Sequence, residues 1–177
     1  MILNCHNCRL RPWHTSDKAA LLKHANNYKI WQNLRDRFPH PYTHADADWW
    51  LQHAGQQQPL SLFAIEVNGE AAGSIGLDLQ QDVERTSAEL GYWLGEAYWG
   101  KGIATAAIRA ITTWAMPALG LSRIYALPFI HNQGSVRALE KAGYLREGVL
   151  RRSAIKEGKI LDQALYAFTD LDLAQKN

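Results

Sequence analysis

A glycine-rich stretch at residues 95–105, GEAYWGKGIAT, contains residue types that suit the binding of a phosphate group. Gly95, Gly100 and Lys101 fit the ATP-binding loop pattern G-x-x-x-x-G-K-S/T, but the last position of the pattern is Gly102. An ATP-binding loop needs a hydroxyl at that position to hold Mg²⁺, and glycine has none. The stretch therefore predicts a pyrophosphate held by backbone amides, without ATP and without a metal ion.

The glycine-rich stretch joins the end of an expected strand, residues 85–95, to the start of an expected helix, residues 103–116. The first backbone N–H groups of a helix have no partner inside it, and the helix dipole favours an anion there. Gly100 and Gly102 remove side chains that would keep a phosphate away from those groups. Coenzyme A carries such a pyrophosphate, although a plain glycine turn before a packed helix would use the same residues.

Two further places hold side chains that could take part in acid–base chemistry. Asn132 and Ser135 open an expected helix, where such residues also serve as plain helix caps. Glu89 lies in the strand before the glycine-rich stretch, where a carboxylate could take a proton from an attacking amine. The alternative for Glu89 is a solvent-facing carboxylate that pairs with Arg85 or with a lysine.

Hydrophobic periodicity and turn residues place these groups in an alternating series of elements. The expected strands are residues 9–13, 60–67, 71–80, 85–95 and 122–129, followed by two more near the end of the chain. The expected helices are residues 15–27, 28–38, 43–57, 103–116 and 132–143, the fourth ending before Pro117 and the fifth at Gly143. This order predicts a mixed α/β fold with a largely antiparallel sheet, in one domain, because 177 residues suit a single core.

The composition argues against several classes of partner. A net charge of +2 without a Lys/Arg run argues against nucleic acid, and no apolar stretch is long enough to cross a membrane. The apolar part of the first residues is too short and too polar for a secretory signal, so we expect a cytoplasmic protein. Cys5 and Cys8 lack the second pair or spaced histidines of a zinc site, and we expect two reduced cysteines near the first strand.

Two consecutive stretches of the sequence resemble one family. ELGYWLGEAYWGKGIATAAIRAI, followed by HNQGSVRALEKAGY, is similar to the central motifs of the GNAT superfamily of acetyl-CoA-dependent N-acetyltransferases. The superfamily pattern Q/R-x-x-G-x-G/A falls on residues 99–104, with Trp99 in the Gln/Arg position. The upstream stretch NLRDRFPHPYTHADADWWL resembles the branch that acetylates ribosomal-protein N-termini, so the resemblance covers nearly the whole chain.

The resemblance implies one N-acetyltransferase domain over residues 1–177, with a largely antiparallel sheet of about seven strands, flanking helices and a V-shaped acetyl-CoA cleft. Backbone groups of the strand before the glycine-rich stretch would hold the pantetheine arm, and the amides of residues 100–105 would hold the pyrophosphate. The coenzyme-binding residues that it implies are Trp93, Leu94, Gly95, Trp99, Gly100, Lys101, Gly102, Ile103, Ala104, Thr105 and Asn132.

The resemblance also implies direct attack of a primary amine on the thioester, without a covalent enzyme intermediate. Glu89 would act as the base, and Ser135 would give a proton to the departing CoA thiolate. Leu139 stands where many relatives have a proton-donating tyrosine, and Ala154 stands where some have a glutamate base. These two departures leave Glu89 and Ser135 as the expected catalytic residues, although water could serve in place of either.

The sequence defines the acceptor less closely. A protein N-terminal amine leads under the resemblance; a lysine side chain, a polyamine, an aminoglycoside and a non-catalytic CoA-binding module are the alternatives. The absence of a dense acidic cluster disfavours a polycation. A monomer or a homodimer is expected. The aromatic residues that would pack in the core or line an acceptor groove are Tyr28, Trp31, Phe38, Tyr42, Trp49 and Trp50.

Overall fold

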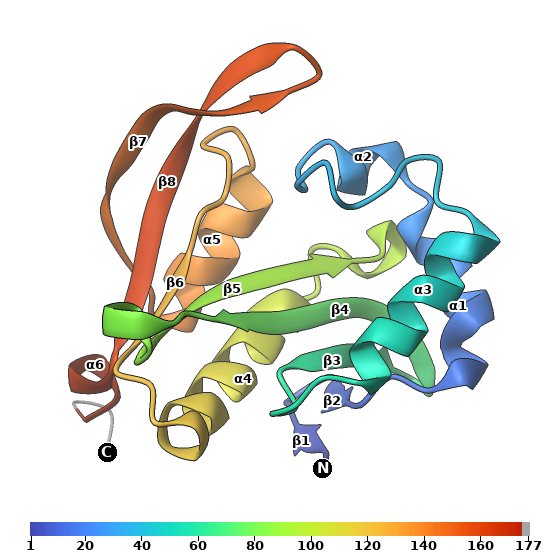
Figure 1. Cartoon of the computed structure of the whole chain (residues 1–177), viewed down its shortest axis with the longest axis horizontal. Coiled ribbons are helices and arrows are strands. Elements are labelled where there is room, and N and C mark those ends of the chain that lie inside the picture. Colours follow the sequence, from blue (N-terminus) through green and yellow to red (C-terminus); the bar gives the residue numbers. More distant parts are fainter. Residues whose placement is uncertain (175–177) are drawn as a thin grey trace.

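An eight-stranded sheet runs through the computed structural model, which describes residues 1–174 (Figure 1). The strand order is β1-β2-β3-β4-β5-β6-β8-β7, and all neighbouring strands are antiparallel except β5 and β6, which are parallel. The expected mixed α/β fold with a largely antiparallel sheet is confirmed. The strand beyond the expected seven is β1, whose two residues are too few to leave a periodic pattern in the sequence.

The helices and strands follow one another in the expected order. The strands are β1 (Leu3–Asn4), β2 (Arg9–Arg11), β3 (Leu62–Val67), β4 (Glu70–Leu79), β5 (Ser87–Leu94), β6 (Arg123–Ala126), β7 (Leu145–Lys156) and β8 (Lys159–Thr169). The helices are α1 (Lys18–Ala25), α2 (Tyr28–Trp31), α3 (His44–Gly55), α4 (Ile103–Leu119), α5 (Gln133–Ala142) and α6 (Asp170–Ala174). None of these helices is long and apolar enough to span a membrane.

Two expected helix bounds are wrong. Helix α4 does not end before Pro117, because the burial of Ala115 and Met116 holds its last turn in the core. It ends instead at Gly120, whose φ of 63° places its N–H on the Met116 carbonyl. The helix expected at residues 28–38 is only α2, because the Asn33 and Gln32 side chains bond to the Lys29 carbonyl and compete with the helical backbone.

The two faces of the sheet pack against different helices (Figure 1). Helices α4 and α5 enclose the larger cluster of buried side chains, and α1 and α3 enclose the smaller one. Successive residues of a strand point to opposite faces, so Leu90 and Leu94 of β5 join the larger cluster while Trp93 joins the smaller one. Strand β5 thus presents different side chains to the two layers, and the site described below depends on this alternation.

The hairpin of β1 and β2 turns at the two cysteines. The Cys5 backbone N–H donates to the Cys8 carbonyl at 2.9 Å, and both thiols are free. Within residues 1–174 no group of three or more histidine, cysteine or carboxylate side chains could hold a metal ion. The C-x-x-C spacing therefore marks a turn in a hairpin in this part of the chain.

Candidate active site

A cleft of about 1440 Å³ opens where β5 and β6 separate. The two parallel strands pair only from Ser87 to Glu89 on β5, and β6 then ends at Ala126 while β5 continues to Leu94. Over residues 90–94, within the described chain, β5 is paired with β4 alone. Its free edge can therefore bind an extended chain through backbone hydrogen bonds, as an added strand would.

The glycine-rich stretch lies at the end of this edge and leads into α4. Gly100 and Gly102 both have a φ of 74°, a left-handed conformation that favours glycine, and Gly102 is the N-cap of α4. Ala106 makes the first helical bond, to the Gly102 carbonyl, so the amides of the three residues before it have no helical partner. These residues, Ile103 to Thr105, line the cleft, and the positive end of the helix dipole points into it.

Close contacts fix the start of the glycine-rich stretch. A Cβ on Gly95 would lie 2.7 Å from His24 Nδ1 of α1, so only glycine fits there, and the Gly95 N–H donates to the Ala72 carbonyl at 2.8 Å. The indole Nε1 of Trp99 donates to the Leu94 carbonyl at 2.7 Å and ties the stretch back to β5. Trp99 therefore stabilises the conformation of the glycine-rich stretch, although Trp99 itself is 44% exposed.

Lys101, expected to bind the coenzyme, does not line the cleft. Its Nζ donates to the Ala97 carbonyl at 2.8 Å and lies 5.6 Å from the centre of the Tyr98 ring, so the ammonium is turned back along the stretch. The Lys101 carbonyl accepts a hydrogen bond from Asn7 Nδ2 in the β1–β2 turn at 2.8 Å. The stretch is thus supported from outside by the first hairpin.

Two basic side chains that the sequence reasoning missed face the cleft from α5. Arg137 and Lys141 both line it, and α5 packs against α4, the helix that the glycine-rich stretch opens. Their spacing of four residues places them on one side of α5, and this spacing is the signal that could have identified them. They give this end of the cleft a positive charge that suits an anionic ligand.

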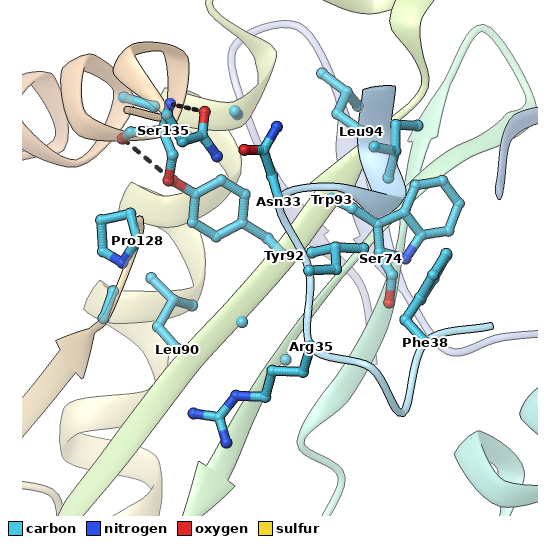
Figure 2. A pocket seen from close by; sticks show the side chains of 18 of the residues that line it. Asn33, Arg35, Phe38, Ser74, Leu90, Tyr92, Trp93, Leu94, Pro128 and Ser135 are labelled. Carbon is cyan, nitrogen blue, oxygen red and sulfur yellow. Dashed lines mark hydrogen bonds between the residues drawn. The ribbon is translucent and has the colours of Figure 1, made fainter. Parts of the chain in front are cut away.

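The start of α5 brings Asn132 and Ser135 to the cleft in separate roles. Asn132 Oδ1 accepts a hydrogen bond from the Ser135 backbone N–H at 3.2 Å, which is the cap of the helix. Ser135 Oγ lies 2.7 Å from the hydroxyl of Tyr92, which reaches across from β5 (Figure 2). Burial raises the pKa of Tyr92 to about 12. Leu139, one turn further along α5, is fully buried.

Glu89 forms an ion pair with Arg35, which comes from the loop after α2. The Glu89 side chain is only 19% exposed, whereas that of Arg35 is 55% exposed. The expected partner, Arg85 or a lysine, is therefore wrong, because the true partner is brought in by the fold from far along the chain. Glu89 and Tyr92 are three residues apart on β5, so they lie on opposite faces of the strand and both line the cleft.

Residues 28–38, called segment 28–38 below, form one wall of the cleft, to which Asn33, Arg35 and Phe38 belong (Figure 2). The ring of Phe38 packs edge-on against Trp93 with the ring centres 5.9 Å apart. Asn33 Oδ1 lies 3.1 Å from His131 Nε2 on the loop before α5, so the segment bridges to the opposite wall. Of the aromatic residues expected here, Tyr42 is buried and Trp49 is 60% exposed.

The tip of the β7–β8 hairpin holds segment 28–38 from its outer side. Lys156 Nζ donates to Asp36 Oδ1 at 2.8 Å and lies 3.8 Å from the centre of the Trp31 ring. The Tyr28 hydroxyl donates to Glu157 Oε2 at 2.9 Å. Two segments that are far apart in the chain thus meet at this side of the cleft, and the Lys156 side chain is only 3% exposed there.

The residues that are present fit a long anionic ligand with an extended arm. Unpaired helix amides and left-handed glycines suit a pyrophosphate, the free edge of β5 suits the amide groups of a pantetheine arm, and α5 supplies positive charge. Of the three carboxylates of the lining, Asp78 and Glu89 lie opposite one another on β4 and β5, and Asp46 lies on α3, while Arg35 and Arg37 also line the cleft. The open end of the cleft therefore carries charge of both signs.

Comparison with known proteins places the chain among acetyltransferases. The family described as Acetyltransferase (GNAT) domain matches residues 7–145. An uncharacterized N-acetyltransferase, p20 of Bacillus licheniformis, is 30% identical over 70% of this chain and 68% of its own length. YdaF of Bacillus subtilis (strain 168), whose name provisionally assigns it as a ribosomal N-acetyltransferase, is 34% identical over 68% of this chain and 64% of its own length.

A solved structure shares the fold almost throughout. RimJ of Mycobacterium smegmatis, in complex with CoA-disulfide, superimposes with a TM-score of 0.86 at 24% identity, covering 98% of this chain and 89% of that one. At this level of identity the likeness concerns the fold. The sequence matches to the two curated relatives reach about two thirds of those proteins' lengths, 68% and 64%.

Proposed function

The chain belongs to the GNAT acetyltransferase family, and on that basis we propose that it acetylates the α-amino group of a protein N-terminus. It is an N-acetyltransferase whose co-substrate is acetyl-CoA. The observation that carries the proposal is the free edge of β5, which ends at unpaired helix amides on one side and begins at Glu89 on the other. A thioester held along this edge would lie between a phosphate site and a carboxylate.

We assign the coenzyme to backbone groups on one wall and to cations on the other. The amides at residues 100–105 would hold the pyrophosphate, and the edge at residues 93–95 would hold the pantetheine arm. Trp99 would keep the stretch in place through the Leu94 carbonyl, and Asn132 would hold the first turn of α5. Arg137 and Lys141 would add attraction for the phosphates.

The two faces of β5 suit the two halves of the reaction. Glu89 on one face would accept a proton from the incoming ammonium, directly or through water, when the acceptor replaces Arg35 at its carboxylate. Acetyl-CoA supplies an activated acyl group on a thiol leaving group. Ser135 on the other face would supply a proton or a hydrogen bond to the sulfur as the carbon–sulfur bond breaks. Attack would be direct, with no covalent enzyme intermediate.

An N-terminal α-amine fits the acceptor side better than a polyamine does. Arg35 and Arg37 of segment 28–38 line the cleft, and Arg35 is paired with Glu89, so a ligand with several positive charges would meet repulsion there. The relation to YdaF supports a ribosomal protein as the source of the N-terminus. A small-molecule amine with one positive charge is the alternative that the same mixed charge allows.

We also propose that residues 1–177 act as one domain in the cytoplasm. The same sheet carries both walls of the cleft, and the two core clusters lie on its two faces. Two free cysteines near one another agree with a reducing compartment. The chain would work as a monomer or a homodimer.

The test is acetyl transfer to a panel of amines, followed by release of the free CoA thiol and by mass spectrometry of the products. The panel holds a peptide with a free N-terminus, the same peptide with a blocked N-terminus and a free lysine, an amino acid, and spermidine. We expect transfer to the first peptide and little to the second. Transfer to spermidine alone would overturn the acceptor assignment. Binding of CoA without transfer to any amine would identify a non-catalytic CoA-binding module.

A further inference from the structure

Tyr92 and Ser135 form a hydroxyl pair across the cleft (Figure 2). The Tyr92 hydroxyl lies 2.7 Å from Ser135 Oγ and 3.3 Å from the Ser135 carbonyl oxygen. A distance of 2.7 Å is the usual length of an O–H···O hydrogen bond, whereas 3.3 Å is beyond the usual range. Ser135 Oγ is therefore the main partner of the Tyr92 hydroxyl.

The direction of this hydrogen bond decides what Ser135 can do. The hydroxyl of tyrosine carries one proton that it can donate, and so does the hydroxyl of serine. If Tyr92 donates to Ser135 Oγ, then Ser135 keeps its own proton free to donate into the cleft. If Ser135 donates to Tyr92 instead, the serine proton is used up inside the pair. The first arrangement is the one in which Ser135 can serve the reaction.

We propose that Tyr92 is a positioning residue for acetyl transfer, whose phenol donates to Ser135 Oγ and so directs the serine O–H at the sulfur of the departing CoA. This inference rests on the proposed function and concerns the leaving group alone. The carbon–sulfur bond breaks and its electron pair stays on sulfur. The serine and phenol protons remain on their oxygens throughout, and the thiolate is stabilised by a hydrogen bond.

The order of proton affinities supports a hydrogen bond rather than a transferred proton. Burial raises the pKa of Tyr92 to about 12, so the phenol stays protonated and remains a donor at neutral pH. A thiol of the cysteine type has a pKa of about 8.5. A thiolate is thus too weak a base to remove a proton from the tyrosine or from the serine, but it readily accepts a hydrogen bond from a hydroxyl.

The surroundings hold the pair in one geometry. Tyr92 is half-buried and packs against the larger core cluster, so side chains of the core hold its ring in place. The Ser135 backbone is held by the Asn132 cap at the first turn of α5. Each hydroxyl is therefore fixed by its own wall, and the pair joins β5 to α5 at the point where the two walls face each other.

The molecule contains a matched pair of hydroxyls elsewhere. The hydroxyls of Tyr144 and Thr112 are also 2.7 Å apart, and both residues are buried in the core rather than in the lining of the cleft. Tyr144→Phe therefore removes the same kind of hydrogen bond as Tyr92→Phe, at two residues that do not line the cleft. It serves as the control for a purely structural effect.

The experiment measures the thiol pKa of CoA bound to the protein, from the ultraviolet absorbance of the thiolate as a function of pH. The variants are Tyr92→Phe, Ser135→Ala, the two combined, and Tyr144→Phe. We expect Ser135→Ala to raise the pKa of the bound thiol by about one, because a hydrogen bond to a charged group is lost. Tyr92→Phe should raise it by about half as much, and the double variant should equal Ser135→Ala, because Tyr92 acts through Ser135.

Several outcomes would overturn the proposal. Among them are an unchanged thiol pKa in Tyr92→Phe, effects that add in the double variant, and an equal shift in Tyr144→Phe. The kinetic counterpart is a lower kcat in Tyr92→Phe with an unchanged KM for acetyl-CoA. If the shifts appear but no amine is acetylated, the proposed function fails and the hydroxyl pair stands. If amines are acetylated and Tyr92→Phe behaves as the parent, the proposed role of the hydroxyl pair fails and the proposed function stands.

Discussion

The two sides of the cleft present different kinds of chemical group to a ligand. On the coenzyme side the groups available for binding belong to the backbone, at the free edge of β5, the left-handed glycines and the first turn of α4. On the acceptor side, side chains from distant parts of the chain meet in pairs, such as Arg35 with Glu89 and Asp36 with Lys156. The first side is local in sequence, and the second is assembled only by the fold.

This difference predicts how each side responds to change. A backbone site tolerates most substitutions but fails where a glycine must keep its conformation or leave room for a ligand. Each ion pair of the acceptor side has one exposed partner, and a substitution of that partner should cost little, because an ion pair exposed to solvent contributes about 0.2–1 kcal/mol. Substitutions on the coenzyme side should therefore act strongly at few positions, and those on the acceptor side weakly at more.

The largest effect is expected from Gly102→Val. A β-branched residue at a φ of 74° is strained, and its side chain would stand where a phosphate meets the α4 amides. Loss of hydrogen bonds to a charged group should lower acetyl-CoA affinity by about a hundredfold, or about 2.7 kcal/mol. Calorimetry measures this directly.

Gly120→Val is the matched control, because Gly120 has a φ of 63° at the other end of the same helix. It should lower the melting temperature and leave acetyl-CoA affinity as in the parent. If both variants lose affinity alike, the strain acts through α4 as a whole and the phosphate site lies elsewhere.

Glu89→Gln tests whether the acceptor side contains a catalytic group. An α-amino group has a pKa of about 7.7–8.0, so part of it is already neutral at pH 7. We expect kcat/KM to fall about tenfold to thirtyfold at neutral pH, below the usual range for a general base, and to recover as the pH rises. Superimposable pH–rate curves for the variant and the parent would make Glu89 a plain partner of Arg35.

Arg35→Gln also tests the acceptor side, and we expect a smaller change in kinetics than for Glu89→Gln. Removing the side chain that competes with the acceptor ammonium for Glu89 should lower the KM for the acceptor amine by about fivefold at most, with the KM for acetyl-CoA unchanged. Arg37→Gln, on the same segment, is the control for a general loss of positive charge. A change in the KM for acetyl-CoA would contradict the separation of the two sides.

The smallest effect is expected from Asn7→Ala, which removes the hydrogen bond from the β1–β2 turn to the Lys101 carbonyl. This bond is exposed, so acetyl-CoA affinity should fall only about twofold. Asn4→Ala, on β1 of the same hairpin, is the control. A loss of tenfold or more would mean that the hairpin sets the shape of the glycine-rich stretch.

The same difference explains what the sequence predicts and what it does not. The glycine-rich stretch, its strand and its helix are adjacent in the chain, so periodicity and residue type place them correctly. The Asn132 cap is also local. The Arg35–Glu89 pair and the Tyr92–Ser135 pair join residues more than forty positions apart, and their geometry depends on how β5 meets its neighbours. Helix α4 passes Pro117 because buried side chains outweigh a local preference.

The position of β8 between β6 and β7 has a consequence for synthesis on the ribosome. Strand β7 pairs only with β8 in the described sheet, yet β8 follows it in the chain. Helix α5 shares its core cluster with Ala164, Tyr166 and Phe168 of β8, so the coenzyme side is complete only after β8 has joined the sheet. Lys156 can anchor segment 28–38 only after β8 has joined the sheet. Both sides of the cleft would thus be completed by the same late strand, and a nascent chain would acquire its two binding sites together.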